Sequence, residues 1–341
     1  MNRSLLPALS LLLAAALAGC SAASDSAAPA DAAGSSKPSA SGMSSTADAP
    51  APSYPVSVSN CGTTVTLTAP PERIVTIKST SLETVLALGL GSKVVGTAFL
   101  DGPVPESMAA AAEGLPSLSD AAPSQEVVLE SEPDFIYAGW ESNLSADAAG
   151  ERGSLASLGI SSYVSPAACR AEGAPGKLTF DSVFDDITEA GALLGAPDAA
   201  AELIADQRDV LAGVEPAGDG RTAFWFSSGR DTPYAGAGLG APQMMMEELG
   251  LKNIAADVQE SWASLSWETV VAANPDVIVL VDADRNTAES KKELLKSNPA
   301  TAGMDAVINN RYLVLPFAAG EAGVRNAEAV ADLADQLSTL P

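Results

Sequence analysis

Aromatic, hydroxyl and arginine side chains follow the predicted β-strands of this chain. In open parallel sheets a ligand binds beyond the carboxyl ends of the strands, and a small-molecule site combines apolar walls with a few placed polar groups. Each of these loop residues can instead be an ordinary solvated turn. The candidate ligand-binding residues are Lys78, Ser79, Thr80, Phe99, Trp140, Glu141, Asn143, Arg170, Ser228, Arg230, Tyr234, Trp262, Arg285, Phe317 and Arg325. The other polar residues at predicted strand ends are Asp101, Ser227, Asp231, Ser264, Asp284, Asn286 and Glu321.

The cations in this set predict the charge of the ligand. The chain has a formal net charge of -25 at pH 7, which repels an anion at long range. An anionic ligand can therefore be held only if cations make the electrostatic potential inside the binding site positive. Gly238 to Gly240 precede a helix whose N-terminal amides add partial positive charge there. The alternative is that the arginines neutralise neighbouring acids and the ligand is neutral. The cations at predicted strand ends are Lys78, Arg170, Arg230, Arg285 and Arg325.

Enzymatic and nucleic-acid functions find little support in the composition. The chain contains no histidine, which excludes His-ligated zinc, a His base and a Ser-His-Asp triad. Gly236 to Ala241 fits a dinucleotide fingerprint with Asp257 near the acidic position, but residues 229–235 separate these glycines from the strand. The strong negative charge argues against nucleic acid and anionic membrane surfaces. We expect no enzyme, no cofactor and no metal site.

Alternating strands and helices must position the candidate residues. Residues 56–67 alternate around Asn60-Cys61-Gly62 and predict a hairpin, and the later alternation predicts an α/β fold with mostly parallel sheets. The predicted strands are 74–77, 94–96, 135–138, 162–164, 223–226, one near Ile254, 277–281 and 312–315. The predicted helices are 81–88, 146–158, 242–249, 267–273, 291–295 and 322–337.

A helical segment and a repeated passage predict two lobes. Residues 178–216 carry apolar side chains at steps of three and four, interrupted by Gly191, Gly195 and Pro197, which predicts a long kinked helical spine. Residues 124–140 and 266–282 share one pattern. In each, Ser is followed after one residue by Glu, then by an apolar helical turn, by Pro-Asp and by an apolar run typical of a β-strand. We therefore expect two Rossmann-like lobes of similar topology, residues 56–177 and 217–341, joined by residues 178–216.

The first residues predict that the protein is exported from the cytoplasm. Arg3, an apolar run from Leu5 to Leu17 and a small-residue site form a signal peptide over residues 1–19, too short for a membrane span. Leu-Ala-Gly-Cys resembles the lipobox of bacterial lipoproteins and implies a lipid on Cys20; the alternative is an ordinary secretory signal with a chance cysteine. Residues 20–55 are rich in Ala, Ser, Pro and Gly, so we expect a lipidated Cys and a flexible tether.

The two remaining cysteines, Cys61 and Cys169, both precede the spine. In an oxidising compartment they are expected to form a disulfide within the first lobe. The alternative is two buried thiols.

Taken together, these motifs resemble class III solute-binding proteins of ABC importers, the group that serves ferric siderophores, haem and cobalamin. The resemblance rests on the lipobox, the tether, the hairpin, Ile-Val-Thr-Ile after Pro-Pro-Glu-Arg, the doubled block and the spine. It implies a monomeric, non-enzymatic binding protein whose partners are a permease, an ATPase and a small-molecule ligand. It also implies that Glu126 and Glu268 dock to permease arginines, although both can simply stabilise a helix N-terminus.

Several shorter stretches resemble an actinobacterial subgroup proposed to bind a deazaflavin precursor, coenzyme F(420)-0. They include Asn60-Cys61-Gly62, Ile77 to Thr80, Ala138 to Asn143, Asp231 to Tyr234 and Glu321 to Asn326. The resemblance thus implies capture of an anionic aromatic or chelate molecule, since a flat ring with acidic groups favours stacking aromatics and arginines. A ferric siderophore or cobalamin is the alternative ligand. An extracytoplasmic enzyme and a sensory lipoprotein are the other functions weighed.

Overall fold

The computed structural model describes residues 53–170 and 172–341. The predicted signal peptide, Cys20 and the predicted tether up to residue 52 lie outside the described residues. Among the helices of the described residues, none is long and apolar enough to cross a membrane.

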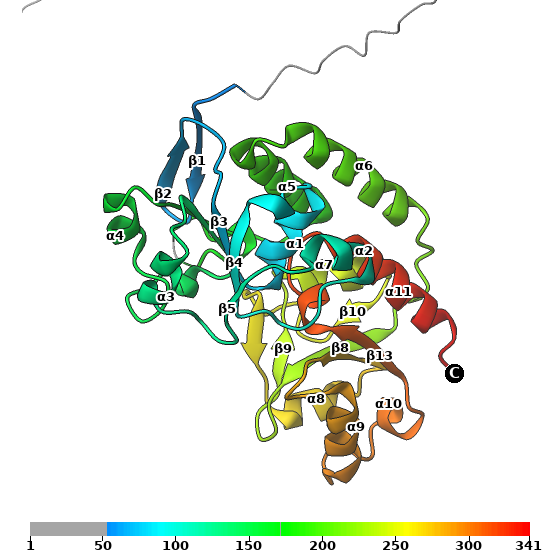
Figure 1. The fold of residues 1–341 in the computed structure, drawn as a ribbon. Coiled ribbons are helices and arrows are strands. Elements are labelled where there is room, and N and C mark those ends of the chain that lie inside the picture. The colour runs from blue at the N-terminus through cyan, green and yellow to red at the C-terminus, as the bar shows by residue number, and fades with distance from the viewer. Residues whose placement is uncertain (1–52, 171) are drawn as a thin grey trace, which may run out of the picture. The chain divides into compact units, whose positions relative to one another are not determined.

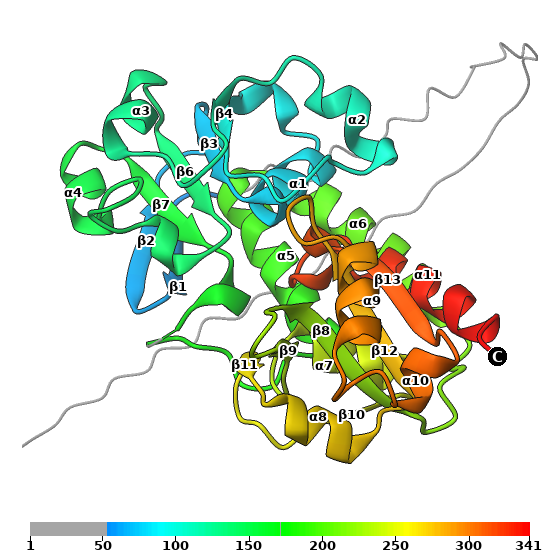
Figure 2. The same cartoon turned by 90° about the horizontal axis from the view of Figure 1, so that it is seen from below.

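The first group of strands forms a hairpin and a parallel sheet (Figures 1 and 2). The predicted hairpin is present as β1 (Val56–Asn60) and β2 (Thr63–Leu67), which pair antiparallel. The parallel sheet has the order β5-β4-β3-β6-β7, and its central strand is buried along its whole length. Its strands are β3 (Ile74–Ile77), β4 (Val94–Ala98), β5 (Ser117–Ser119), β6 (Phe135–Ala138) and β7 (Ser161–Val164). The accompanying helices are α1 (Ser79–Ala87), α2 (Glu106–Ala112), α3 (Gln125–Glu130) and α4 (Arg152–Ser157).

The second group of strands forms a mainly parallel sheet of order β11-β9-β8-β12-β13, with β10 paired to β8. The antiparallel pairs are those that β9 makes with β8 and β11. Its strands are β8 (Thr222–Ser228), β9 (Tyr234–Gly236), β10 (Lys252–Asn253), β11 (Trp262–Ser264), β12 (Val277–Asp282) and β13 (Tyr312–Pro316). The helices are α7 (Ala241–Glu248), α8 (Trp267–Ala273), α9 (Ala288–Ser297), α10 (Asp305–Ile308) and α11 (Asn326–Ser338). The α/β prediction with mostly parallel sheets is confirmed.

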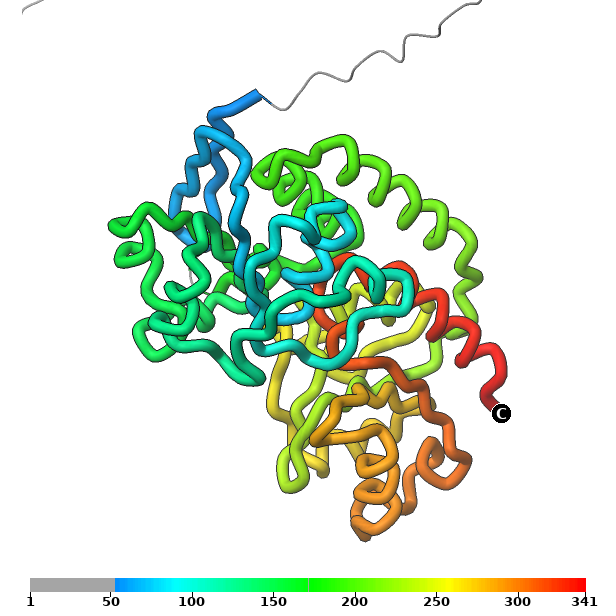
Figure 3. The backbone as a smooth tube through the Cα atoms, viewed as in Figure 1, coloured from blue at the N-terminus to red at the C-terminus, as the bar shows by residue number. Residues whose placement is uncertain are grey.

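Two helices make up the predicted spine, α5 (Phe180–Leu194) and α6 (Pro197–Ala212), through which the chain passes from the first sheet to the second (Figure 3). Thr179 caps α5 by accepting a hydrogen bond from the Ser182 amide at 3.1 Å. Gly195 ends α5 in the left-handed region at φ 80°, and a Cβ there would lie 2.8 Å from Pro70. Proline at the start of α6 suits a helix N-terminus. The kink is therefore a short break between two helices.

The repeated passage folds in the same way in both lobes. Ser124 begins α3 and accepts a hydrogen bond from the Val127 amide at 3.4 Å, while Ser266 begins α8 and accepts one from Thr269 at 3.1 Å. Each helix then leads to a buried strand of its sheet, β6 or β12. The boundaries of the five segments proposed from the sequence stay a prediction.

Two helices start later than the sequence predicts. The predicted helix 146–158 begins only at Arg152, because the Ala149 amide bonds the Asn143 carbonyl at 3.1 Å and Gly150 has φ 106°. The predicted helix 322–337 begins at Asn326, whose side-chain amide bonds the carbonyls of Ala319 and Glu321 at 3.0 and 2.8 Å. The short elements α2, α10, β5, β9 and β11 were not predicted.

Candidate functional site

A cavity of about 370 Å³ lies between segments that follow strands of both sheets. The first sheet contributes residues after β3, β6 and β7, and the second contributes residues of β8 and β9 and those after β13. This is the region where parallel sheets hold ligands. The residues lining it are Thr80, Gly139, Trp140, Ser165, Ala167, Ala168, Cys169, Arg170, Leu178, Ser227, Ser228, Tyr234, Gly240, Ala241, Ser261, Trp262, Phe317, Gly320, Glu321 and Ala322.

Aromatic side chains form much of the cavity wall. Tyr234 and Trp262 stack with ring centroids 6.1 Å apart and planes 15° apart. They stand at diagonal positions of the antiparallel pair β9 and β11, where aromatic side chains on one face reach each other. Tyr234 is 40% exposed, so the pair presents a flat apolar surface at the cavity that a planar ligand can contact. Trp140 and Phe317 line other parts of the wall.

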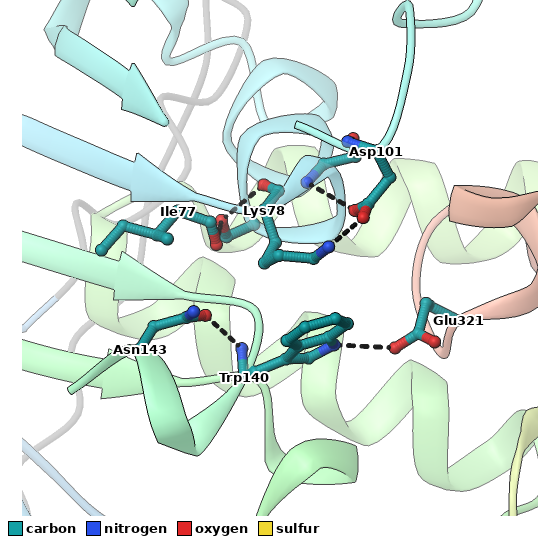
Figure 4. Close-up of polar contacts among 8 residues, drawn as sticks. Ile77, Lys78, Asp101, Trp140, Asn143 and Glu321 are labelled. Carbon is teal, nitrogen blue, oxygen red and sulfur yellow. Dashed lines mark hydrogen bonds and ion pairs between the residues drawn. The ribbon is translucent and has the colours of Figure 1, made fainter. Parts of the chain in front are cut away.

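Lys78 lies beside the indole ring of Trp140 (Figure 4). Its ammonium is 3.8 Å from the ring centroid of Trp140, 4.4 Å from Phe99 and 5.3 Å from Phe317. A Cβ at Gly139 would come within 2.6 Å of the Lys78 side chain, so this packing requires glycine there. Burial lowers the pKa of Lys78 to about 8, and the charge of Glu321 opposes this shift.

Asp101 neutralises Lys78 through a direct ion pair. The loop around Asp101 is fixed to the start of α1, because its amide donates to Ser79 Oγ at 2.8 Å and its carboxylate accepts from the Ser79 amide at 3.3 Å. Lys78 is only 2% exposed. It therefore acts as part of a closed polar cluster and is not a free cation at the cavity.

Glu321 connects the two lobes at the cavity wall (Figure 4). The Trp140 indole donates to Glu321 Oε2 at 3.0 Å, and the Trp140 amide donates to Asn143 Oδ1 at 3.0 Å. Burial raises the pKa of Glu321, while the hydrogen bond from Trp140 and the charge of Lys78 oppose this shift. The bond fixes the orientation of an indole ring that lines the cavity.

A model of the periplasmic binding protein family matches residues 74–319. The chain belongs to this family. It is similar to an uncharacterized ABC transporter substrate-binding lipoprotein of Bacillus subtilis, with 26% identity over 300 residues, 83% of this chain and 86% of that protein. A cobalamin-binding protein of Halobacterium salinarum is 30% identical over 254 residues, 68% of this chain and 60% of that protein.

Solved structures agree with this family. The structure described as an ABC-type Fe3+-hydroxamate transport system of Saccharomonospora viridis has a TM-score of 0.71 and 28% identity, and it covers 83% of this chain and 99% of that chain. The two-lobed fold of the periplasmic binding proteins is thus present here. The chain is a non-enzymatic component of a transport system.

The structure brings about half of the predicted ligand residues of this binding protein to the cavity. Those that line it are Thr80, Trp140, Arg170, Ser228, Tyr234, Trp262 and Phe317. Others lie behind them: Lys78 and Phe99 pack on Trp140, Ser79 holds Asp101, Asn143 holds Trp140, and Glu141 accepts from the Arg170 amide at 2.6 Å. Whether any of them contacts a ligand stays a prediction.

Four of the five predicted cations do not line the cavity. Arg325 forms a two-point ion pair with Glu83 at 2.5 and 2.6 Å, and Arg230 and Arg285 are exposed outside the lining. Arg170 is the cation that remains, and Gly240 brings the start of α7 to the wall. The expected set of converging cations is therefore not assembled. The dinucleotide interpretation also lacks its geometry, because the strand before these glycines is the antiparallel β9.

Sequence reasoning missed several lining residues. Ser165 directly follows β7, so the strand-end rule could have found it, whereas Ser227, near the end of β8, is placed at a strand end by the sequence but is not in the predicted ligand set. Glu321 also stands at a predicted strand end, in the same loop as Phe317 and Arg325, but it is not in the predicted ligand set. Ser261 and Leu178 carry no local signal, because they reach the cavity from a loop before β11 and the residues before α5.

The predicted disulfide joins Cys61 to Cys169, with Cα atoms 5.1 Å apart. Cys61 lies in the turn between β1 and β2, and Cys169 lies in the cavity wall next to Arg170. The bond therefore ties the segment that carries Arg170 to the hairpin.

Proposed function

We propose that this protein is the extracytoplasmic substrate-binding lipoprotein of an ABC importer and that it captures a compact metal chelate in the cavity between its lobes. The observation that carries the proposal is the cavity itself, which lies at strand ends of both sheets and has aromatic walls. Its volume of about 370 Å³ falls in the range of small-molecule sites.

The relatives support a chelate as the ligand. One of them is an ABC-type Fe3+-hydroxamate transport system and another is a cobalamin-binding protein. A ferric hydroxamate is smaller than a corrinoid and is therefore the better match to a cavity of about 370 Å³. Ferric hydroxamates are therefore the first ligands to test.

The deazaflavin precursor is the second candidate ligand. The stacked rings of Tyr234 and Trp262 suit a flat ring system, and Arg170 is available to an acidic group. None of the three relatives described above has a name that refers to a deazaflavin. Lys78, Arg230, Arg285 and Arg325, which were expected to bind its acidic groups, do not line the cavity. For these reasons the chelate is the preferred ligand.

Membrane attachment and docking complete the proposal. A lipid on Cys20 would anchor the protein, as the description of the Bacillus subtilis relative as a lipoprotein supports. Glu126 and Glu268 stand exposed in the first turns of α3 and α8, at equivalent places of the repeated passage. They are our candidates for contact with the permease.

Calorimetric titration tests the ligand. Purified mature protein is titrated with a ferric trihydroxamate, cyanocobalamin and the deazaflavin precursor, and mass spectrometry identifies any ligand that co-purifies from the native host. Tight binding of a ferric hydroxamate supports the proposal. Tight binding of the deazaflavin precursor alone, or of none of the three, rejects the chelate.

Charge reversal tests the docking residues. Glu126→Lys and Glu268→Lys should each abolish uptake of the chelate by cells while leaving its affinity for the purified protein unchanged, because both residues lie outside the cavity lining. Glu130→Lys, an exposed residue at the end of α3, is the matched control and should transport normally. Normal uptake by both reversed variants contradicts the docking role.

A further inference from the structure

Glu321 is one of two charged residues in the described lining of the cavity, the other being Arg170. Its position is fixed by the segment that follows β13. Asn326, which is fully buried, donates to the Glu321 carbonyl at 2.8 Å and accepts from the Gly323 amide at 2.8 Å. The carboxylate therefore stands on a rigid support, as a preorganised binding group does.

One oxygen of this carboxylate has spare capacity. Oε2 accepts the hydrogen bond from the Trp140 indole, whereas no donor within residues 53–170 and 172–341 bonds to Oε1. The ammonium of Lys78 is held by Asp101 instead. A carboxylate accepts several hydrogen bonds, so Glu321 can accept a further donor from the cavity side.

The surroundings of Glu321 favour a positively charged donor. The rings of Trp140 and Phe317 line the same wall, and aromatic faces attract cations. Lys78, which already lies near both rings, is neutralised by Asp101, so a further cation at this wall does not meet an unpaired positive charge. Burial raises the pKa of Glu321, while the Trp140 hydrogen bond and the charge of Lys78 oppose this shift, so a cation at the open oxygen would stabilise the ionised carboxylate further. The net charge of -25 also attracts a cation at long range.

We propose that Glu321 makes the cavity selective for chelates that carry a protonated amine or a similar cationic donor, which its open oxygen binds beside the indole of Trp140. This inference rests on the chelate function proposed above and names the charge of the ligand, opposite to the anion expected from the sequence. Arg170, at the exposed part of the lining, then remains for an acidic or carbonyl group of the same ligand.

Two probes that share one ferric core separate charge from the chelate. The ferric complex of desferrioxamine B carries a pendant ammonium, and its N-acetylated form lacks that charge. We expect the wild-type protein to bind the ammonium form about ten- to a hundredfold more tightly, the range of a charge-assisted hydrogen bond. In Glu321→Gln, which can still accept from Trp140, the two probes should bind about equally.

Controls and pH complete the test. Glu260→Gln removes an equal charge from an exposed residue outside the lining, and this variant should still bind the ammonium form more tightly than the acetylated form.

The preference of the wild-type protein for the ammonium form should shrink as pH falls through the raised pKa of Glu321, because the protonated acid no longer attracts a cation. Equal binding of both probes by the wild type overturns this inference alone. Failure of both probes to bind rejects the hydroxamate function and this inference with it.

Discussion

At the scale of single residues, Asp186 on α5 is a partly buried acid among other acids. Burial raises its pKa from 3.8 to about 7, and the charges of Glu189 and Asp185 add to the shift. Glu189 is itself occupied by the hydroxyl of Tyr163, which donates to it at 2.7 Å. In the folded protein Asp186 therefore holds its proton to a higher pH than in the unfolded chain.

Asp186→Asn should make the protein more stable at pH 8 and change it little near pH 4. Between about pH 4 and 7 the folded state binds more protons than the unfolded state, so ionisation of Asp186 lowers the free energy of unfolding as pH rises. The limiting slope is about 1.4 kcal/mol per pH unit for one group. Urea unfolding across this pH range measures the effect.

Asp209→Asn is the matched control, because Asp209 is an exposed acid on the neighbouring helix α6 and does not contribute to the shift of Asp186. It should leave the pH profile nearly unchanged. An Asp186→Asn variant whose stability falls equally at both pH values would show that the carboxyl group supports the fold.

At the scale of elements, the Cys61–Cys169 disulfide connects the β1–β2 hairpin to the loop after β7. The residues between the two cysteines, 108 apart in sequence, include the whole first parallel sheet. Replacing both cysteines by alanine should lower the free energy of unfolding by about 2 to 5 kcal/mol, because the unfolded chain gains freedom. Ligand affinity should fall as well, since Cys169 and Arg170 belong to the cavity wall.

Denaturant unfolding with and without reductant measures this effect. Reductant should destabilise the wild-type protein and leave the double variant unchanged. Wild-type protein that unfolds at the same denaturant concentration with and without reductant would contradict the prediction.

The sequence predicted elements well where the signal is local. Ser124 and Ser266 as helix caps, the apolar β3 and the glycine hairpin turn all depend on neighbours within a few residues. The late starts of α4 and α11 depend on Gly150 and on the side chain of Asn326, which periodicity does not register. The short strands β9 and β11 are stabilised by pairing with each other, and β9 also pairs with β8, contacts that the local sequence does not show.

The site was harder to predict, because its charges are paired over long sequence distances. Lys78 meets Asp101 23 residues away, and Arg325 meets Glu83 242 residues away. A count of cations at strand ends therefore predicted an anion site, whereas folding pairs two of these cations with acids. The aromatic residues were better predicted, since Trp140, Tyr234, Trp262 and Phe317 all line the cavity.

At the scale of the whole binding protein, side-chain bonds join the two lobes, and two of them involve the segment that follows β13. One is the hydrogen bond from Trp140 to Glu321, and the other is the ion pair between Arg325, at the start of α11, and Glu83 of α1. Arg325 also donates to the Pro103 carbonyl at 3.0 Å. The side chains of Glu83 and Arg325 are only 1% and 11% exposed, so their pairing is a buried one.

Arg325→Gln should destabilise the contact between the lobes more than the double variant Glu83→Gln with Arg325→Gln. The single change leaves a buried carboxylate without its cation, at a cost of about 3 to 5 kcal/mol, whereas the double change leaves two neutral amides. Burial already raises the pKa of Glu83 against the effect of Arg325. Without Arg325 the acid should therefore take up a proton at low pH, and the loss of stability should then be smaller.

Arg208→Gln, which breaks the exposed pair with Asp181 at 2.7 Å, is the control and should cost little stability. Urea unfolding measures stability, and small-angle scattering measures separation of the lobes; an Arg325→Gln variant that matches Arg208→Gln in both would show that this ion pair does not hold the lobes together.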